Sequence, residues 1–156
     1  MDRLKVLCRT ARASDTADML ELTRTIWDGH DYVPQVWPEW LAGPLGLLAV
    51  AEYQGHVIGL YKLSQSSSHE WWLQGLRVHP DFQGLGVASR LHDYILDYWQ
   101  RQCGGVVRLA ASPAPGLGGT EMPRYVALIY GTVETGWPSD PAVGAAVMED
   151  YFAFGD

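Results

Sequence analysis

Cysteine and long apolar runs are scarce in this sequence. Cys8 and Cys103 lie far apart, and neither belongs to a CxxC pair or to a cluster of cysteines and histidines. The sequence therefore predicts neither a disulfide framework nor a metal site, and we expect both thiols to be reduced and buried. No apolar run approaches the roughly 20 residues that span a bilayer, and the N-terminal stretch lacks the apolar core of a secretory signal. We therefore expect a cytoplasmic protein.

Positive charge is also scarce, with 11 Lys and Arg against 18 Asp and Glu, and only Lys5 and Lys62 are lysines. The net charge of −7 disfavours non-specific binding to nucleic acid or to an anionic membrane, because both need a surplus of basic side chains. A small-molecule partner fits this composition better. The length of 156 residues predicts a single domain over residues 1–156.

The first part of the chain alternates between strand and helix patterns. Residues 4–10 are typical of a strand, and Asp15 is placed to cap a helix over residues 16–26. Residues 27–44 are interrupted by proline and glycine, so we expect a structured loop with at most a short helix around residues 35–41.

A β-rich region follows. Two apolar runs on either side of Gln54-Gly55 predict an antiparallel hairpin over residues 45–64, because glycine can supply the positive φ of a tight turn. Residues 70–78 form the next expected strand, with Trp72 directed inward and Gly75 at a bulge.

The clearest helix is predicted over residues 87–102, where apolar side chains recur every three or four positions. Gly104-Gly105 ends it, and residues 106–110 are typical of a buried strand. A strand, helix and strand in this order form a crossover whose strands are parallel, so the sequence predicts an α/β fold with a mixed sheet. A further short helix is predicted over residues 121–130, and residues 132–156 show no strong period.

The junction between the strand at 70–78 and the long helix reads LRVHPDFQGLGVASRL, residues 76–91. The first N–H groups of a helix have no partner within it and carry its positive partial charge, and glycines such as Gly84 and Gly86 let an anion approach them. The junction is therefore a candidate phosphate-binding loop. A Rossmann fingerprint would need glycine at Ser89, and a P-loop would need Gly-Lys-Ser/Thr, so neither motif is present.

This junction resembles the signature of the GNAT superfamily, the acetyl-CoA-dependent N-acetyltransferases. Its pattern Gln/Arg-x-x-Gly-x-Gly/Ala is matched by Gln83, Gly86 and Ala88, and Gly84 is also typical. The resemblance extends to the Leu-x-Val-x-Pro before the loop and to the hairpin. It covers residues 1–131, and residues 132–156 are divergent or shortened. It implies a GNAT fold, in which helices flank a mixed central sheet with a β-α-β core for acetyl-CoA.

Three segments resemble the histidine N-acetyltransferase-like branch of this superfamily. They are IWDGHDYVPQVWPEWL at 26–41, GLRVHPDFQGLGVASRL at 75–91 and EMPRYVALI at 121–129. The resemblance implies acetyl transfer to the amine of a small molecule, with a free amino acid such as histidine as one candidate. Dimers are common in the superfamily, so the resemblance leaves a homodimer open.

The resemblance assigns acetyl-CoA to two groups of residues. Backbone groups of Leu76 and Val78 would pair with the pantetheine arm, and the side chains of Arg77 and Arg90 could add positive charge. The residues assigned to the pyrophosphate are Gln83, Gly84, Leu85, Gly86, Val87, Ala88 and Ser89.

In such enzymes the amine attacks the thioester directly, so the protein must supply a neutral amine, a donor to the carbonyl oxygen and a proton for the thiolate. A backbone N–H near Leu76 is the expected donor. Many relatives have a glutamate base where this chain has Gln74, whose amide cannot accept a proton at neutral pH. The weak candidates for the base are Glu70, His79 and Asp31.

The proton donor and the acceptor pocket are less defined. Ala127 stands where the superfamily has its usual tyrosine, and Tyr125 and Tyr130 flank it, so Tyr130 is a weak catalytic candidate. The candidate acceptor pocket consists of Asp31, Tyr32, Trp37 and Trp40, although the same residues would also suit an aromatic core under a loop. The other histidines, His30, His56, His69 and His92, are expected at the surface or in turns.

Three functional hypotheses follow. The first is an acetyl-CoA-dependent N-acetyltransferase that acts on a small amine. The second is a non-catalytic acyl-CoA-binding module, a sensor or half of a larger assembly, which Gln74 would suit. The third is an interaction domain without acyl-CoA, in which Gly84 and Gly86 form only a turn.

Overall fold

The computed structural model describes residues 4–111 and 126–130. Within these ranges, six strands form one sheet in the order β1-β2-β3-β4-β5-β6. All neighbouring strands are antiparallel except β4 and β5, which are parallel, so the predicted mixed α/β sheet is confirmed. The strands are β1 Leu7–Thr10, β2 Leu47–Tyr53, β3 His56–Gln65, β4 Glu70–Val78, β5 Val106–Ala111 and β6 Val126–Tyr130.

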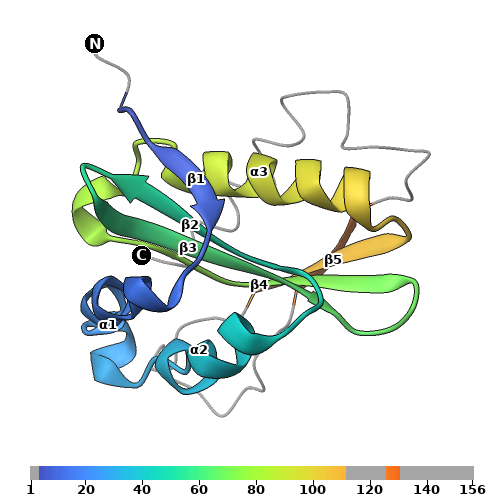
Figure 1. Ribbon diagram of the computed structural model, residues 1–156, viewed down its shortest axis with the longest axis horizontal. Helices are drawn as coiled ribbons and strands as arrows, with labels where there is room; N and C mark the ends of the chain where they lie inside the picture. Colours follow the sequence, from blue (N-terminus) through green and yellow to red (C-terminus); the bar gives the residue numbers. More distant parts are fainter. Residues whose placement is uncertain (1–3, 112–125, 131–156) are drawn as a thin grey trace.

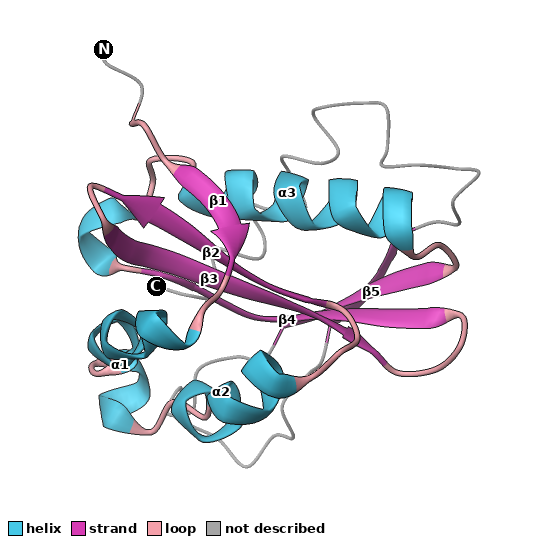
Figure 2. Ribbon diagram, in the orientation of Figure 1, coloured by secondary structure: helices cyan, strands magenta, loops and turns pink. Residues whose placement is uncertain are grey.

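The helices cover both faces of this sheet. Figure 1 shows α3 on one face and α1 and α2 on the other, and Figure 2 shows the same division by secondary structure. The α-helices are α1 Thr16–Thr23, α2 Val33–Ala42 and α3 Val87–Gln102, and the short 3-10 helices are η1 Ala13–Asp15, η2 Ile26–Gly29 and η3 Pro80–Phe82. Among the described residues, no helix combines the length and the apolar character that crossing a membrane requires.

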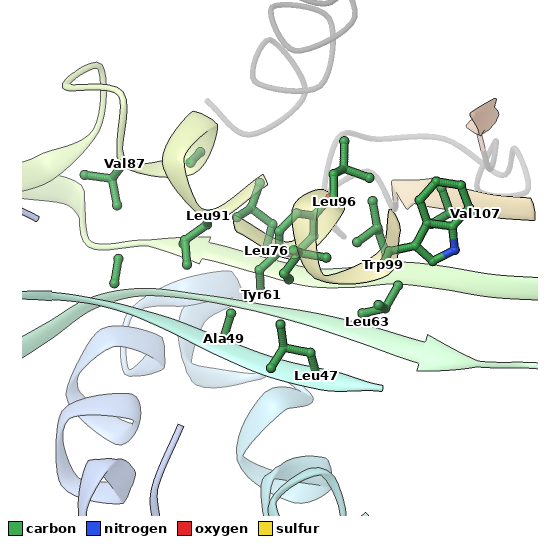
Figure 3. Close-up of a cluster of buried hydrophobic side chains, with 14 of the residues drawn as sticks. Leu47, Ala49, Tyr61, Leu63, Leu76, Val87, Leu91, Leu96, Trp99 and Val107 are labelled. Atoms are coloured by element: carbon green, nitrogen blue, oxygen red, sulfur yellow. The ribbon is translucent and has the colours of Figure 1, made fainter. Parts of the chain in front are cut away.

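A hydrophobic core fills the space between α3 and the sheet, and we call it the α3-side core (Figure 3). The predicted helix over residues 87–102 is confirmed, because its period of three and four directs Leu91 and Ile95, both 0% exposed, into this core. Leu63 and Leu73 meet them from β3 and β4, and each is also 0% exposed.

A second hydrophobic cluster, the α1/α2-side core, lies on the opposite face. It consists of Met19, Leu22, Val33, Trp37, Leu48, Val50, Val57 and Leu60. Strands β2 and β3 contribute to both cores because successive side chains of a strand point to opposite faces. Seven consecutive residues of β3, from Val57 to Leu63, are buried.

The hairpin between β2 and β3 is confirmed. Gln54 and Gly55 have φ values of 50° and 82°, which is the pair of positive φ angles that a type I′ turn requires. The bulge expected at Gly75 is also confirmed. The register of β3 against β4 shifts where Leu60 pairs with Arg77 and Lys62 pairs with Gln74, and Gly75 has a φ of 69°.

One predicted element was wrong and another was too short. Residues 126–130 form strand β6 beside β5 rather than the end of a helix. The sequence VALIY is rich in residues that favour strands, and pairing with β5 decides its conformation. Residues 121–125 lie outside the described residues. The segment 27–44 contains a longer helix, α2, than expected. Its Val33 and Trp37, four positions apart, are 0% and 1% exposed, and this burial outweighs the cost of Pro38 inside the helix.

Three expectations for single side chains also need correction. Trp71 rather than Trp72 is the buried tryptophan of β4, at 7% exposure. His92, expected at the surface, is 2% exposed and stacks on Tyr61 at 6.0 Å between ring centroids. Asp15 precedes α1, but its carboxylate accepts hydrogen bonds from Arg9 and from the Arg12 backbone N–H instead of capping that helix.

Several local expectations were right. The remaining histidines, His30, His56 and His69, are exposed. The two cysteines are free, although they are half-buried rather than buried.

Candidate active site

Strand β4 has an edge that β5 leaves open. The parallel pairing runs from Glu70–Val106 to Leu73–Leu109, whereas β4 continues to Val78. Among the described residues, the segment 74–78 therefore pairs only with β3, on its other side. We call this segment the open edge of β4. It offers backbone donors and acceptors to an extended ligand in the way that any unpaired strand edge does.

The candidate phosphate loop follows the open edge directly. Residues 83–86 are exposed, and Gly84 and Gly86 have φ values of 74° and 81°. A Cβ added at either glycine would meet nothing within 4 Å. The Arg90 N–H donates to the Gly86 carbonyl at 3.1 Å, so the N–H groups of the preceding first turn of α3 have no carbonyl within the helix. The loop thus combines open space with the positive end of a helix.

The two arginines that the resemblance assigned to acetyl-CoA are engaged elsewhere. Arg90 donates to the carbonyl oxygens of Leu4 and Val6, at 2.9 and 3.4 Å. Arg77 extends toward the α2 face of the sheet and contacts Asp31. The amide of Gln83 donates to the Val78 carbonyl at 3.3 Å, which ties the loop to the end of β4. Within the described residues, the loop therefore presents backbone N–H groups to an anion rather than arginine side chains.

The β4 bulge is covered by two aromatic side chains from the α2 region. An added Cβ on Gly75 would lie 2.7 Å from Cη2 of Trp40 and 3.6 Å from the Tyr32 hydroxyl. The Tyr32 and Trp40 rings meet edge to face, with their centroids 6.3 Å apart. Burial raises the pKa of Tyr32, and the nearby Arg77 guanidinium opposes this shift. Glycine at position 75 is thus what allows Trp40 to sit on the strand.

A buried ion pair lies beside these rings. The Arg77 guanidinium donates to both carboxylate oxygens of Asp31, at 2.8 and 3.0 Å, and these side chains are 12% and 1% exposed. Asp31 also accepts from the Val33 N–H at 3.0 Å, at the start of α2. The guanidinium lies 5.5 Å from the centre of the Tyr32 ring, and its Nη1 donates to the Leu76 carbonyl at 2.9 Å.

This arrangement divides the four residues that were expected to line an acceptor pocket. Tyr32 and Trp40 meet at the bulge, as a pocket wall would require. The Asp31 carboxylate accepts hydrogen bonds from Arg77 and from the Val33 N–H, so it is not available to bind an amine. Trp37 is 1% exposed and its indole N–H donates to Thr16 at 3.1 Å, so it belongs to the α1/α2-side core.

The weak catalytic candidates do not converge on one place. Glu70 forms an ion pair with Arg108 at 2.7 Å, and at about 3.3 Å per residue it stands about 16 Å along the strand from Gly75. His79 accepts from the Asp81 N–H at 3.2 Å, about 10 Å beyond Leu76. Only Gln74 adjoins the bulge, and its amide donates to Ser64 at 2.7 Å.

Tyr130 is the last residue of β6, where it pairs with Val107 of β5. The expectation that placed it on a helix does not apply, because residues 126–130 form a strand.

Lys62 is a buried cation that the sequence analysis did not connect with the site. It is 4% exposed, and burial lowers the pKa of its ammonium group. Lys62 pairs with Gln74 in the register of β3 and β4. Its Nζ lies 3.5 Å from the Leu45 carbonyl oxygen, so the side chain extends toward the connection between α2 and β2. A lysine inside an apolar strand pattern is the signal that could have identified it.

A family model matches most of the chain. Residues 15–115, well over half of the chain, match the acetyltransferase (GNAT) family. This range includes the open edge of β4, the phosphate loop and all of α3.

Curated relatives are similar over part of their length. A human protein described as probable N-acetyltransferase 16 is 31% identical over 109 residues, which cover 69% of this chain and 30% of that protein. Histidine N-acetyltransferase of Scomber australasicus is 33% identical over 82 residues, which cover 52% of this chain and 24% of that protein. The matches thus span less than a third of the length of these relatives.

Solved structures share the fold. A GNAT family N-acetyltransferase from Escherichia coli, crystallised in complex with CoA, matches with a TM-score of 0.61 and 21% identity. The match covers 74% of this chain and 67% of that one. The fold expected from the sequence is therefore confirmed.

Proposed function

Because the chain belongs to the GNAT acetyltransferase family, we propose that it transfers an acetyl group from acetyl-CoA to the primary amine of a small molecule. The observation that carries this proposal is the continuity of the open edge of β4 with the phosphate loop. One segment of chain offers strand-like backbone pairing and then a helix N-terminus with open space above its glycines. An extended arm that ends in a pyrophosphate, as in CoA, fits these two features in this order.

The residues of this chain have distinct tasks in the proposed reaction. Bound acetyl-CoA supplies an activated acetyl thioester. Backbone groups of Leu76 and Val78 on the open edge hold the arm, and the first turn of α3 binds the pyrophosphate. A backbone N–H at the bulge donates to the carbonyl oxygen as it gains negative charge, which is the interaction that lowers the barrier most in acyl transfer.

The proposed site lacks an evident base among the described residues at the bulge. Gln74 adjoins the bulge, but its amide donates to Ser64 and cannot accept a proton. We infer that the acceptor amine reaches the thioester already neutral. Its nitrogen forms a bond to the acetyl carbon, the bond from that carbon to sulfur breaks, and the proton that the nitrogen loses balances the charge of the departing CoA thiolate. The rate should then rise with pH until that amine is deprotonated.

The acceptor is proposed to be a small molecule with an aromatic or apolar part. Tyr32 and Trp40 supply a pair of rings at the bulge, whereas the Asp31 carboxylate is bound by Arg77. Histidine is the first acceptor to try, because a relative similar over half of this chain is named histidine N-acetyltransferase. An imidazole ring can stack on the aromatic pair without needing a carboxylate partner.

Titration calorimetry with acetyl-CoA tests the binding step, with Gly86→Trp as the disruptive variant. The indole would occupy the open space in front of α3, so affinity should fall roughly 10-fold or more, equivalent to at least about 1.4 kcal/mol. Gly55→Trp is the matched control. Gly55 also has a positive φ, 82°, and open space around it, but it lies in the β2–β3 turn. Equal affinities of the two variants for acetyl-CoA would contradict the proposed phosphate loop.

An amine panel then separates an enzyme from a non-catalytic acyl-CoA-binding module, which Gln74 would suit. Release of CoA above the rate of hydrolysis, with histidine and other small amines in turn, supports the proposed reaction. Saturable binding of acetyl-CoA without release in the presence of any amine supports the module instead.

A further inference from the structure

The backbone at the bulge of β4 must be held in place by contacts other than strand pairing. At a bulge the ladder is locally interrupted, so the strand pairing does not by itself set the orientation of the extra peptide. Here Gly75 and Leu76, at the beginning of the open edge, have no partner in the register, and pairing with β3 resumes at Arg77, opposite Leu60. The carbonyl of Leu76 is therefore on the unpaired side of the peptide that it shares with Arg77. If the proposed function is right, the peptides of Gly75 and Leu76 are those that face the reacting carbonyl.

Arg77 contacts this backbone directly. Its Nη1 donates to the Leu76 carbonyl at 2.9 Å, and that carbonyl belongs to the same peptide unit as the N–H of residue 77. A trans peptide is planar, with its C=O and N–H pointing in opposite directions. Holding the carbonyl therefore also sets the direction of the N–H.

The guanidinium itself is held rigidly. Its Nε and Nη2 donate to both oxygens of Asp31, and Asp31 is fixed in turn by the Val33 N–H at the first turn of α2. A planar guanidinium with two parallel bonds to a carboxylate has little freedom to rotate. The start of α2 thereby determines where the third nitrogen, Nη1, points.

Helix α2 contacts the same bulge a second time through Trp40. The ring lies on Gly75, which has no side chain to displace it. Asp31 precedes α2 and Trp40 lies near its end, so the helix is attached to the bulge from both ends. The backbone of the open edge and the aromatic side chains above it are thus fixed relative to each other.

We propose that Arg77 is a positioning residue for acetyl transfer. It orients the Leu76–Arg77 peptide of the bulge and, through Asp31, fixes the position of α2 relative to that peptide. This proposal rests on the proposed function for its kinetic consequence, but the orientation of the peptide can be tested without turnover. Arg77 is not needed for the phosphate loop, which lies beyond the open edge and presents backbone N–H groups.

Arg77→Lys is the informative variant, because lysine keeps the positive charge opposite Asp31 but lacks the rigid fork that reaches the Leu76 carbonyl as well. Its affinity for acetyl-CoA should fall much less than its kcat, because the first turn of α3 and the backbone of Val78 still hold the ligand. Its kcat should fall roughly 10- to 100-fold, the size of loss that misplaced reacting groups produce.

Arg9→Lys is the matched control. Arg9 also makes a two-bond contact with an aspartate, Asp15, at 2.8 Å for both bonds, and these side chains are 15% and 7% exposed. Its Nη1 also donates to a backbone carbonyl, that of Thr10, at 3.1 Å. Arg9 lies on β1, which β2 and β3 separate from β4 in the sheet. This variant should lose stability comparably but keep kcat within about twofold.

NMR makes the test independent of turnover. In Arg77→Lys, the carbonyl ¹³C resonance of Leu76 should move upfield, and the amide hydrogen of residue 77 should exchange faster; in Arg9→Lys, both should match the wild type. Unchanged Leu76 signals in Arg77→Lys, or an equal loss of kcat in both variants, would overturn the positioning role. If the wild-type protein turns over no amine while the Leu76 signals change as expected, the proposed function fails and the role in orienting the peptide stands.

Discussion

His92 is a titratable side chain inside the α3-side core. It is 2% exposed, stacks on Tyr61, and burial lowers its pKa to about 4. An unfolded chain would protonate this histidine near pH 6.5. Between these two pH values the unfolded state binds a proton that the folded state does not, so stability is lost as pH falls.

We predict that His92 makes the protein sensitive to mild acid. The free energy of unfolding should fall by about 3 kcal/mol between pH 6.5 and pH 4 because of this residue. His92→Phe keeps a ring beside Tyr61 and should remove that part of the pH dependence, as urea unfolding at several pH values would show. His69→Phe, at an exposed position, should leave the slope unchanged. If the free energy of unfolding depended on pH equally in the wild type and in His92→Phe, this assignment would be contradicted.

The sequence contained part of the information on such residues. Ala88, His92, Leu96 and Trp99 continue the buried face of α3 at a spacing of three and four, so the helical period could have placed His92 inside, despite its polar side chain. The contact between Asp31 and Arg77 could not be found in this way. These residues are 46 positions apart, and only the docking of α2 on β4 brings them together.

The attachment of α2 to β4 is the element-scale feature on which the candidate site depends. Gly75 has a φ of 69°, and an added Cβ would lie 2.7 Å from Trp40. Substitution therefore meets two penalties, the strain of a positive φ and a clash with the ring that α2 lays on the bulge.

We predict that Gly75→Ala destabilises the fold by about 2–3 kcal/mol, the sum of both penalties. Gly55→Ala shares the positive φ, but nothing lies within 4 Å of its added Cβ, so it should lose only about 1 kcal/mol. Chemical denaturation of both variants measures the difference. In a Trp40→Leu background the two substitutions should cost nearly the same. A Gly75→Ala loss no larger than that of Gly55→Ala would show that Trp40 does not press on the bulge.

Elements were predictable where one pattern dominated. Residues 87–102 carry an uninterrupted helical period, and the hairpin and bulge each depend on a glycine whose φ is positive in the structure. Predictions of elements failed where tertiary contacts outweighed the local sequence preference for helix, strand or loop. Helix α2 contains Pro38 yet persists because Trp37 is buried, and β6 is a strand because β5 offers it a ladder.

The charge of the whole molecule sets the conditions under which it can bind an anion. The chain carries a net charge of −7, and the two arginines expected to assist acetyl-CoA binding, Arg77 and Arg90, contact other groups. Binding of the acetyl-CoA phosphates would then depend on backbone N–H groups and the helix end, against a repulsive long-range field.

We predict that the affinity for acetyl-CoA does not fall as salt rises. Between about 0.05 and 0.5 M NaCl the Debye length shrinks severalfold, which screens the repulsion between the protein and the ligand. Calorimetric titrations should give a Kd that is constant within about threefold or that tightens. A tenfold weakening over this range would show that lysine or arginine side chains contact the phosphates.

Strand β3 is buried on both faces, and this burial determines where the chain could be cut into two fragments. Both cores draw on β2 and β3, which are joined at Gln54-Gly55. A cut at this turn would give one fragment with α1, α2 and β2 and another with β3, β4 and α3, and each core would be shared between the two. Neither fragment would retain a complete core of its own. The turn is therefore the natural place for a split reporter, in which the signal appears only when the two fragments reassemble.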